Sequence, residues 1–246
     1  MTPEEMLSRL LYRDGMMLVV DKPAGLSVHR GPKGGSSLED FFEPLRFGLP
    51  RDPALAHRLD RDTSGCLVLG RHRKALALLG KLFKNGAIGK TYWAIVEGGP
   101  AEDEGRIDIA LGKLDEDRGW WMKPDPNGKP SSTTWKVMGR GDGHTWLALE
   151  PLTGRTHQLR VHCAEMGFPI LGDPIYGTQA SLRRLRKESL PRVGGAPLHL
   201  HSREIVVPIS KNKPAIVTVA PPPKHMHDML KQCGWTETDL LISDRG

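Results

Sequence analysis

Residues His57–Gly70 read HRLDRDTSGCLVLG, and the interpretation of the whole chain begins with this stretch. A polar loop that holds Asp60 between Arg58 and Arg61 runs directly into an apolar segment of strand length. Residues 63–65 are typical of a tight polar turn. We predict that Asp60 lies where the strand begins, and that cationic neighbours and hydrogen bonds keep its carboxylate ionised. A solvated turn whose side chains cap the local backbone explains these residues equally well.

A second polar segment, Leu152–His162, reads LTGRTHQLRVH. The spacing predicts one helical stretch over residues 156–166, after a glycine turn. We expect Arg155, His157 and Arg160 to lie on or beside this helix. Such a helix start is well suited to contacts with phosphates and base edges. The alternative is a basic helix face that is simply solvated.

A third segment, Lys90–Gly98, reads KTYWAIVEG and is rich in aromatic and β-branched residues, which predicts a strand. Side chains alternate along a strand, so Tyr92 and Ala94 share one face. A tyrosine beside a cleft can stack on an unstacked base. A core tyrosine with a satisfied hydroxyl is the alternative, and it is favoured when the segment is read alone.

Strands outnumber helices along the rest of the chain. The pattern predicts helices at residues 74–83 and 225–233, and its first strand begins at Met16. Further expected strands, several joined by short turns, cover residues 106–111, 133–138, 145–150, 198–207 and 215–219. We therefore expect an α+β fold with a large mixed, mostly antiparallel sheet flanked by helices, and a single domain over residues 1–246.

Composition narrows the class of protein. The chain has 246 residues, 38% of them hydrophobic, and a formal net charge of +6, which permits a nucleic-acid partner without proving one. Its apolar runs are too short to span a bilayer, and the N-terminus lacks the features of a signal peptide, so we expect a cytoplasmic protein with no membrane partner. Three cysteines, widely spaced, favour neither a disulfide framework nor a CxxC site.

Several other functions are not supported. The segment GAIGKT at residues 86–91 resembles a phosphate-binding loop, but Lys84 stands where its first glycine is required. Ser64 lies near His57, yet no nucleophile elbow surrounds it. The histidine pairs His199 with His201 and His225 with His227 lack a matched third ligand cluster. We therefore expect no metal site and no serine hydrolase activity.

Four segments, taken together and in order, resemble the RluA-type pseudouridine synthases. The segment from His57 matches the family pattern HRLD-x-x-TSG, and KTYWAIVEG matches K-x-Y-x-A-x-V-x-G. LTGRTHQLRVH with the following GFPILGDPIYG matches the GRTHQ-[IL]-R-x-H and GD-x-x-Y-G patterns, and VVDKPAGLSVH fits the opening strand and turn. The resemblance covers about Val19 to Val219. It implies the pseudouridine synthase fold, with a central RNA-binding catalytic cleft.

The resemblance also implies a reaction and a set of residues. Members convert uridine to pseudouridine in RNA without a cofactor or metal, and the essential aspartate falls on Asp60. It would act as a nucleophile at C1′ or as a base at the ribose, and the residues leave both open. The resemblance implies that Arg160 pairs with Asp60; Arg155 is the alternative partner, or else holds a phosphate. Tyr92 would stack on the uracil, and Arg58 would fill the vacated space or hold a phosphate. His57, Thr63 and His157 would shape the site.

In one respect the chain departs from many relatives, which carry an S4-type RNA-binding module ahead of the catalytic domain. We expect no such module here, so RNA would be held by the catalytic domain itself or by partners. Ribosomal RNA and tRNA both stay open as substrates, and we expect a monomer. Two rival functions share these features: a non-catalytic RNA-binding protein, and a glycoside hydrolase using Asp60 with Asp62.

Overall fold

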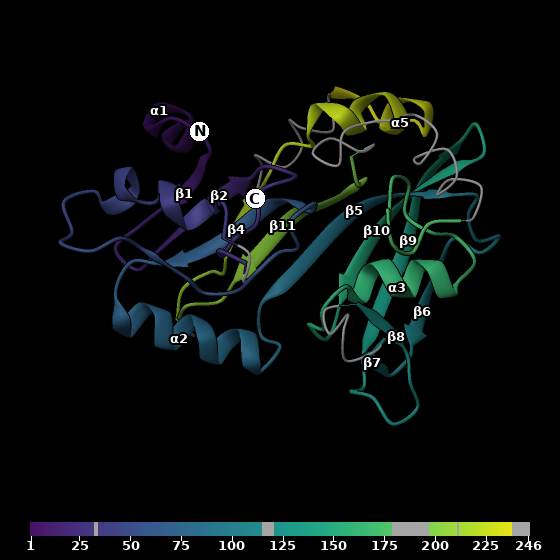
Figure 1. The fold of residues 1–246 in the computed structure, drawn as a ribbon, viewed down its shortest axis with the longest axis horizontal. Helices are drawn as coiled ribbons and strands as arrows, with labels where there is room; N and C mark the ends of the chain where they lie inside the picture. The colour runs from purple at the N-terminus through teal and green to yellow at the C-terminus, as the bar shows by residue number, and fades with distance from the viewer. Residues whose placement is uncertain (32–33, 115–120, 179–196, 211, 238–246) are drawn as a thin grey trace. The chain divides into compact units, whose positions relative to one another are not determined.

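The computed structural model describes residues 1–31, 34–114, 121–178, 197–210 and 212–237 (Figure 1). The helices and 3-10 turns are α1 (Pro3–Ser8), η1 (Leu38–Phe41), η2 (Glu43–Arg46), α2 (Arg73–Lys84), α3 (Gln158–Glu165), η3 (Lys224–Met226) and α5 (His227–Gln232). The strands are β1 (Leu10–Arg13), β2 (Met17–Lys22), β3 (Ala54–Leu55), β4 (Ser64–Gly70), β5 (Gly89–Glu97), β6 (Glu104–Asp108), β7 (Leu111–Lys113), β8 (Met122–Pro124), β9 (Ser132–Gly141), β10 (His144–Pro151), β11 (Leu200–Val207) and β12 (Ile216–Val219).

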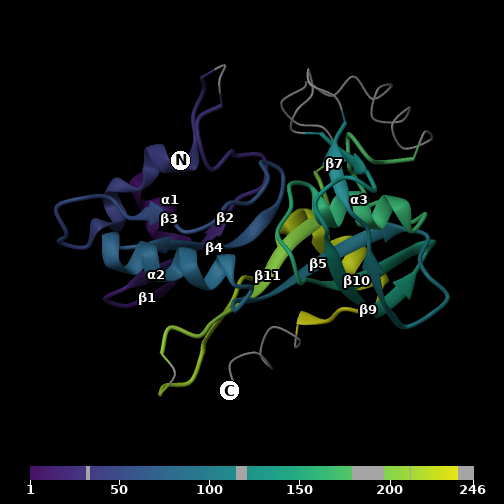
Figure 2. The same cartoon turned by 90° about the horizontal axis from the view of Figure 1, so that it is seen from below.

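The chain divides into two compact units, and neither is continuous in sequence. Unit 1 consists of Met1–Lys90 and Ser202–Pro221, and unit 2 of Thr91–His201 and Pro222–Gly246. Two of the crossings between the units fall within strands β5 and β11 (Figure 2). Both strands therefore contribute residues to each unit.

Unit 1 is built on antiparallel strands. Strand β2 pairs with β1 and β4, β3 pairs with β4, and β12 pairs with β11. Every residue of β4 is buried, which explains why GCLVLG is continuously apolar rather than alternating. Alternate residues of β2 and β4, among them Val19 and Val68, meet Leu79 of α2 in one core cluster. Helix α2 thus packs on one face of this sheet (Figures 1 and 2).

Unit 2 is a second antiparallel group, in which β10 lies between β5 and β9, and β6 pairs with β9. The β9–β10 hairpin turns at Asp142 and Gly143, whose φ angles of 49° and 73° fit the mirror-image turn that matches strand twist. Trp93 and Trp146 pack edge to face with ring centroids 4.6 Å apart. Residues of the C-terminal segment, such as Leu230, complete this core.

The structure confirms the expected fold class. Ten strands are hydrogen-bonded in one sheet, in the path β1-β2-β4-β11-β5-β10-β9-β6, with β3 and β12 attached at β4 and β11. The described registers are antiparallel, and few helices accompany them. The large, mostly antiparallel mixed sheet follows from many short β-rich segments joined by tight turns.

Three local expectations were wrong. Regular structure begins well before Met16, because α1 is held by a capping box between Thr2 and Glu5. The helix expected from residue 156 begins at Gln158, because His157 has a left-handed backbone with φ of 52° and ends the preceding loop. Strand β8, which pairs with β7 in a short hairpin, was not among the expected strands; residues 115–120, between β7 and β8, lie outside the described part of the chain.

Candidate active site

The loop that carries Asp60 leads directly into β4 in unit 1. The Thr63 amide donates a hydrogen bond to the Asp60 carbonyl at 3.3 Å, which closes the turn. Thr63 and Ser64 are buried, whereas Asp60 keeps partial solvent access. Gly65 has a φ of +103°, and a Cβ there would overlap the Ser202 carbonyl of β11. Only glycine fits this close approach, and it holds the end of the loop against the sheet.

Lys22, the last residue of β2, ties this loop to the turn that follows β2. Its side chain is fully buried, and Nζ donates to the carbonyls of Pro23, Leu26 and Arg61, each at 2.8 Å. These three acceptors match the three protons of an ammonium group. Burial lowers the pKa of Lys22 to about 7, while the carboxylates of Asp62, Asp60 and Asp21 raise it. Lys22 therefore combines a structural anchor with a positive charge beside the Asp60 loop.

His57 and Arg58 have different surroundings. The Nε2 atom of His57 accepts a hydrogen bond from the Val68 amide at 3.0 Å, and its ring stacks on Phe83 with centroids 4.4 Å apart. Desolvation by burial is the main cause that lowers the pKa of His57 to about 3, and Lys90 adds to the effect. Its neutral ring thus serves to hold the loop. Arg58 is exposed.

Arg160 lies on α3 in unit 2, where it forms a bidentate ion pair with Asp173. Its Nε and Nη2 donate to the Asp173 carboxylate at 2.7 and 2.8 Å, and both side chains are buried. The same carboxylate accepts the amides of Ile175 and Tyr176, at 2.9 and 3.0 Å. The guanidinium carbon is 5.2 Å from the centre of the Tyr176 ring. These contacts fix the orientation of the guanidinium.

The other polar residues of this segment stabilise the start of α3. His157 Nδ1 lies 2.8 Å from the Tyr176 hydroxyl, which also accepts the Met122 amide at 2.9 Å. The buried Gln158 amide group donates to the Ser132 carbonyl and accepts the Arg155 amide, at 2.9 and 3.0 Å. Exposed Arg155 donates through Nε to the Pro130 carbonyl at 3.1 Å, so its charged end reaches solvent.

Tyr92 lies in β5, opposite Leu149 of β10, and is only 8% exposed. The expected residues thus fall into two groups. Asp60, His57, Arg58 and Thr63 belong to unit 1, and Tyr92, Arg155, His157 and Arg160 to unit 2.

Sequence reasoning did not single out Lys22, Asp173 or Tyr176. Each lies in a segment that matched the family pattern, the last two in GDPIYG. A match to a motif does not, however, distinguish an exposed residue that contacts a ligand from a buried residue that anchors the fold.

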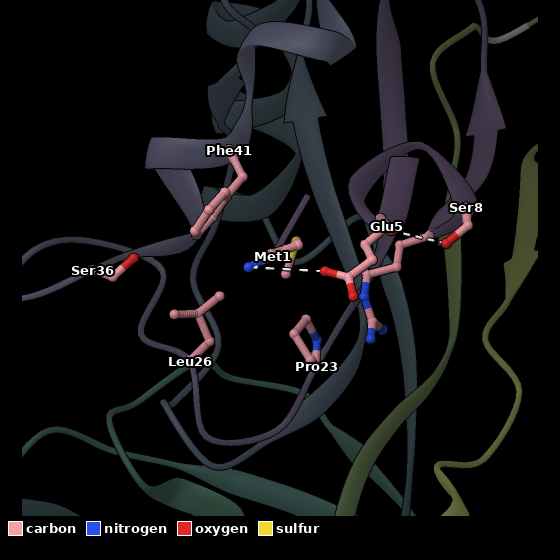
Figure 3. A pocket seen from close by; sticks show the side chains of 8 residues that line it. Met1, Glu5, Ser8, Pro23, Leu26, Ser36 and Phe41 are labelled. Carbon is pink, nitrogen blue, oxygen red and sulfur yellow. Dashed lines mark hydrogen bonds and ion pairs between the residues drawn. The ribbon is translucent and has the colours of Figure 1, made fainter. Parts of the chain in front are cut away.

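A pocket of about 390 Å³ borders the turn that anchors Lys22 (Figure 3). Pro23 and Leu26 line it together with residues of the N-terminal helix and the loop before and within η1: Met1, Glu5, Ser8, Arg9, Ser36 and Phe41. The N-terminal ammonium lies 3.8 Å from the Glu5 carboxylate inside it. All of these residues belong to unit 1.

The described residues lack two further kinds of feature. They contain no group of three or more His, Cys, Asp or Glu side chains placed to hold a metal ion. Within the same residues, every helix is too short or too polar for a membrane span.

Comparison with known proteins assigns the chain to a family. The model of the family described as RNA pseudouridylate synthase matches residues 16–165, a stretch that includes the Asp60 loop, Tyr92 and Arg160. The chain belongs to this family and is an RNA pseudouridine synthase. The resemblance seen in the sequence is therefore confirmed.

Individual relatives agree. An RNA pseudouridine synthase of Zymomonas mobilis, named as uncharacterized, is 42% identical over 90% of this chain and 96% of its own length. Ribosomal large subunit pseudouridine synthase C of Haemophilus ducreyi is 36% identical over 92% of this chain and 69% of its own. The solved structure of human RNA pseudouridylate synthase domain containing 4 matches with a TM-score of 0.75 and 26% identity, covering 94% of this chain and 95% of that one.

Proposed function

We propose that this protein isomerises specific uridines in structured RNA, with Asp60 as the catalytic carboxylate and ribosomal RNA as the first substrate to test. The observation that carries the proposal is the loop HRLDRDTSG, held by Lys22 and Gly65 at the start of a buried strand, in a member of this family. The choice of ribosomal RNA draws on the Haemophilus relative, whose name refers to the large ribosomal subunit. Transfer RNA is the second candidate.

The proposed reaction breaks the C1′–N1 bond of the uridine, turns the uracil and joins C5 to C1′. The proton lost from C5 is balanced by the one gained at N1, so the product has the composition of the substrate. Asp60 acts as a nucleophile at C1′ or as a base at the ribose, and an ionised carboxylate beside an oxocarbenium-like centre serves either role. Tyr92 stacks on the uracil, and its hydroxyl assists proton removal at C5.

The proposal gives the remaining residues supporting roles. Arg160 keeps Asp60 charged, with the pair Arg160–Asp173 setting the direction of the guanidinium. Arg155, whose charged end reaches solvent, and exposed Arg58 hold phosphates next to the target. The target nucleotide has to leave its stack to react, which costs least in loops and at mismatches. One reaction thus uses residues of both units, which we propose to act as a single catalytic domain.

The test is pseudouridine mapping by carbodiimide labelling and primer extension, on ribosomal and transfer RNA from host cells with and without this gene. We expect one or more positions to lose pseudouridine in its absence and to regain it with the wild-type protein, but not with Asp60→Asn. Asp62→Asn is the matched control, because the proposed reaction gives no role to the Asp62 carboxylate, which pairs with Arg61 at 3.0 and 3.2 Å. Pseudouridine formed by Asp60→Asn would refute the proposed mechanism.

A further inference from the structure

Helix α2 has an exposed face that carries only positive charge. Arg73, Lys74, Lys81 and Lys84 are exposed, and no acidic residue occurs between Asp62 and Glu97. Within the described part of the chain, no hydrogen bond or ion pair engages any of these four side chains. We call these four residues the α2 basic face.

Stabilisation of the helix dipole does not explain all of the positive charge on α2. Lys81 and Lys84 lie in the last turn, where they complement the helix dipole. Arg73 and Lys74 lie in the first turn, where the dipole disfavours cations and where no acidic residue compensates. The positive charge in the first turn of α2 therefore reduces the stability of the helix somewhat, and a negatively charged partner would offset that cost.

The α2 basic face also leads toward the Asp60 loop. The opposite side of the helix packs into the unit 1 core through Ala75 and Leu79, so the basic residues are turned to solvent. Phe83, in the last turn, stacks on His57, three residues before Asp60. With a rise of about 1.5 Å per residue, the helix extends roughly 18 Å from there. That length spans several phosphates of a nucleic-acid strand, which lie about 3.4 Å apart along the axis of duplex DNA.

We infer that the α2 basic face docks the phosphate backbone of the RNA substrate beside the target uridine. The inference rests on the proposed function for the identity of the RNA, and it adds a binding surface outside the catalytic residues. Four unpaired cations release counterions from RNA on contact, so they contribute affinity that falls as salt rises. They carry no base specificity, because phosphate contacts position the nucleic acid rather than read it.

The experiment compares three double variants of the full chain. Arg73→Gln with Lys74→Gln, and Lys81→Gln with Lys84→Gln, each remove two charges from the α2 basic face and keep good helix formers. Lys136→Gln with Lys224→Gln removes two exposed charges from unit 2 and is the control of equal net charge. Affinity is measured by fluorescence anisotropy with labelled oligouridylate over a salt series. Turnover is measured by carbodiimide mapping on ribosomal RNA from cells that lack the gene.

We expect each α2 variant to bind about tenfold more weakly at moderate salt and to lower the slope of log affinity against log salt by about 1.5. KM should rise while kcat stays near the wild-type value. Thermal stability of the Arg73 and Lys74 variant should be unchanged or higher, because the dipole penalty is removed. The control should match the wild type in all of these quantities.

Wild-type affinity and salt slope in both α2 variants would overturn the inference, as would an equal loss in the control. Binding does not depend on turnover, so the two proposals can fail separately. If wild-type protein forms no pseudouridine in any RNA, the proposed function fails while the anisotropy data still decide the role of α2. If wild-type protein is active and the α2 variants match it, only the docking surface is rejected.

Discussion

At the scale of single residues, the Asp60 loop depends on a buried cation that does no chemistry in the proposed reaction. Lys22 donates hydrogen bonds to the carbonyls of Pro23 and Leu26, in the turn after β2, and of Arg61. Arg61 directly follows Asp60 in the same loop. Removing the Lys22 ammonium leaves those buried acceptors unsatisfied, and a buried acceptor without a donor costs about 1–3 kcal/mol. Positioning of the Asp60 loop is thus coupled to stability.

We therefore predict that Lys22→Met lowers the free energy of unfolding by on the order of 3 kcal/mol and lowers kcat. Methionine keeps the length and apolar stem of the side chain and removes only the donor. Urea unfolding and turnover assays measure the two effects. Lys136→Met, at an exposed position, is the control and should change neither. An unchanged urea midpoint in Lys22→Met would contradict the anchoring role.

The pKa of His57 predicts an acid-sensitive contribution to stability. Burial lowers this pKa from 6.5 to about 3, so folding favours the neutral ring that accepts the Val68 amide. The stabilisation is fully present above pH 6.5 and is lost as pH falls toward 3, at up to about 1.4 kcal/mol per pH unit. Urea unfolding at several pH values should show a smaller loss on acidification in His57→Gln than in wild type. Parallel curves for the two proteins would exclude this contribution.

Removing the Tyr92 hydroxyl distinguishes a stacking role of the ring from a proton-transfer role of the hydroxyl. Tyr92→Phe keeps the aromatic ring, so we predict unchanged RNA affinity together with a large fall in kcat if the hydroxyl takes part in removing the C5 proton. Anisotropy titration and single-turnover mapping measure affinity and rate. A wild-type rate would restrict Tyr92 to a stacking role. Reduced affinity without a change in kcat would point to lost packing in β5 instead.

At the scale of elements, two glycines with different surroundings give opposite predictions. A Cβ at Gly65 overlaps the Ser202 backbone of β11 and requires a positive φ, so Gly65→Ala should destabilise by roughly 3 kcal/mol and impair turnover. Gly80 lies within α2 and meets nothing within 4 Å, so Gly80→Ala should stabilise by about 1 kcal/mol. Thermal unfolding of both variants checks the pair. Similar effects of the two substitutions would show that neither argument holds.

Some helices and strands could be predicted from the sequence, and others could not. The β9–β10 hairpin and α2 were readable because turn chemistry and hydrophobic period are local properties. Strand β1 was missed because its residues are only partly buried and carry no clear alternation. The start of α3 was misplaced because the left-handed backbone of His157 is stabilised by its contact with Tyr176, nineteen residues away in sequence.

At the scale of the whole molecule, β5 and β11 contribute residues to both units. Because each of these strands is shared by the two units, we predict one cooperative unfolding transition. All six tryptophans lie in the segments of unit 2, so their fluorescence reports on that unit, whereas far-UV circular dichroism reports on both. The urea midpoints of the two signals should coincide. A separate circular dichroism phase would show that the units unfold independently.

The amino-acid sequence alone predicted the family, the reaction and the residue expected to carry it, because chemistry that needs a fixed set of side chains leaves ordered motifs. It also determined the fold class, since strand and turn signals are local. The folded structure was needed to show which motif residues are buried anchors. Lys22 is held by the Arg61 carbonyl, 39 residues away, and His57 and Asp173 by partners 11 and 13 residues away; burial and hydrogen-bond geometry arise only when those segments meet. The continuous positive face of α2 likewise emerged from burial, which turned its apolar side inward and left the cations outside.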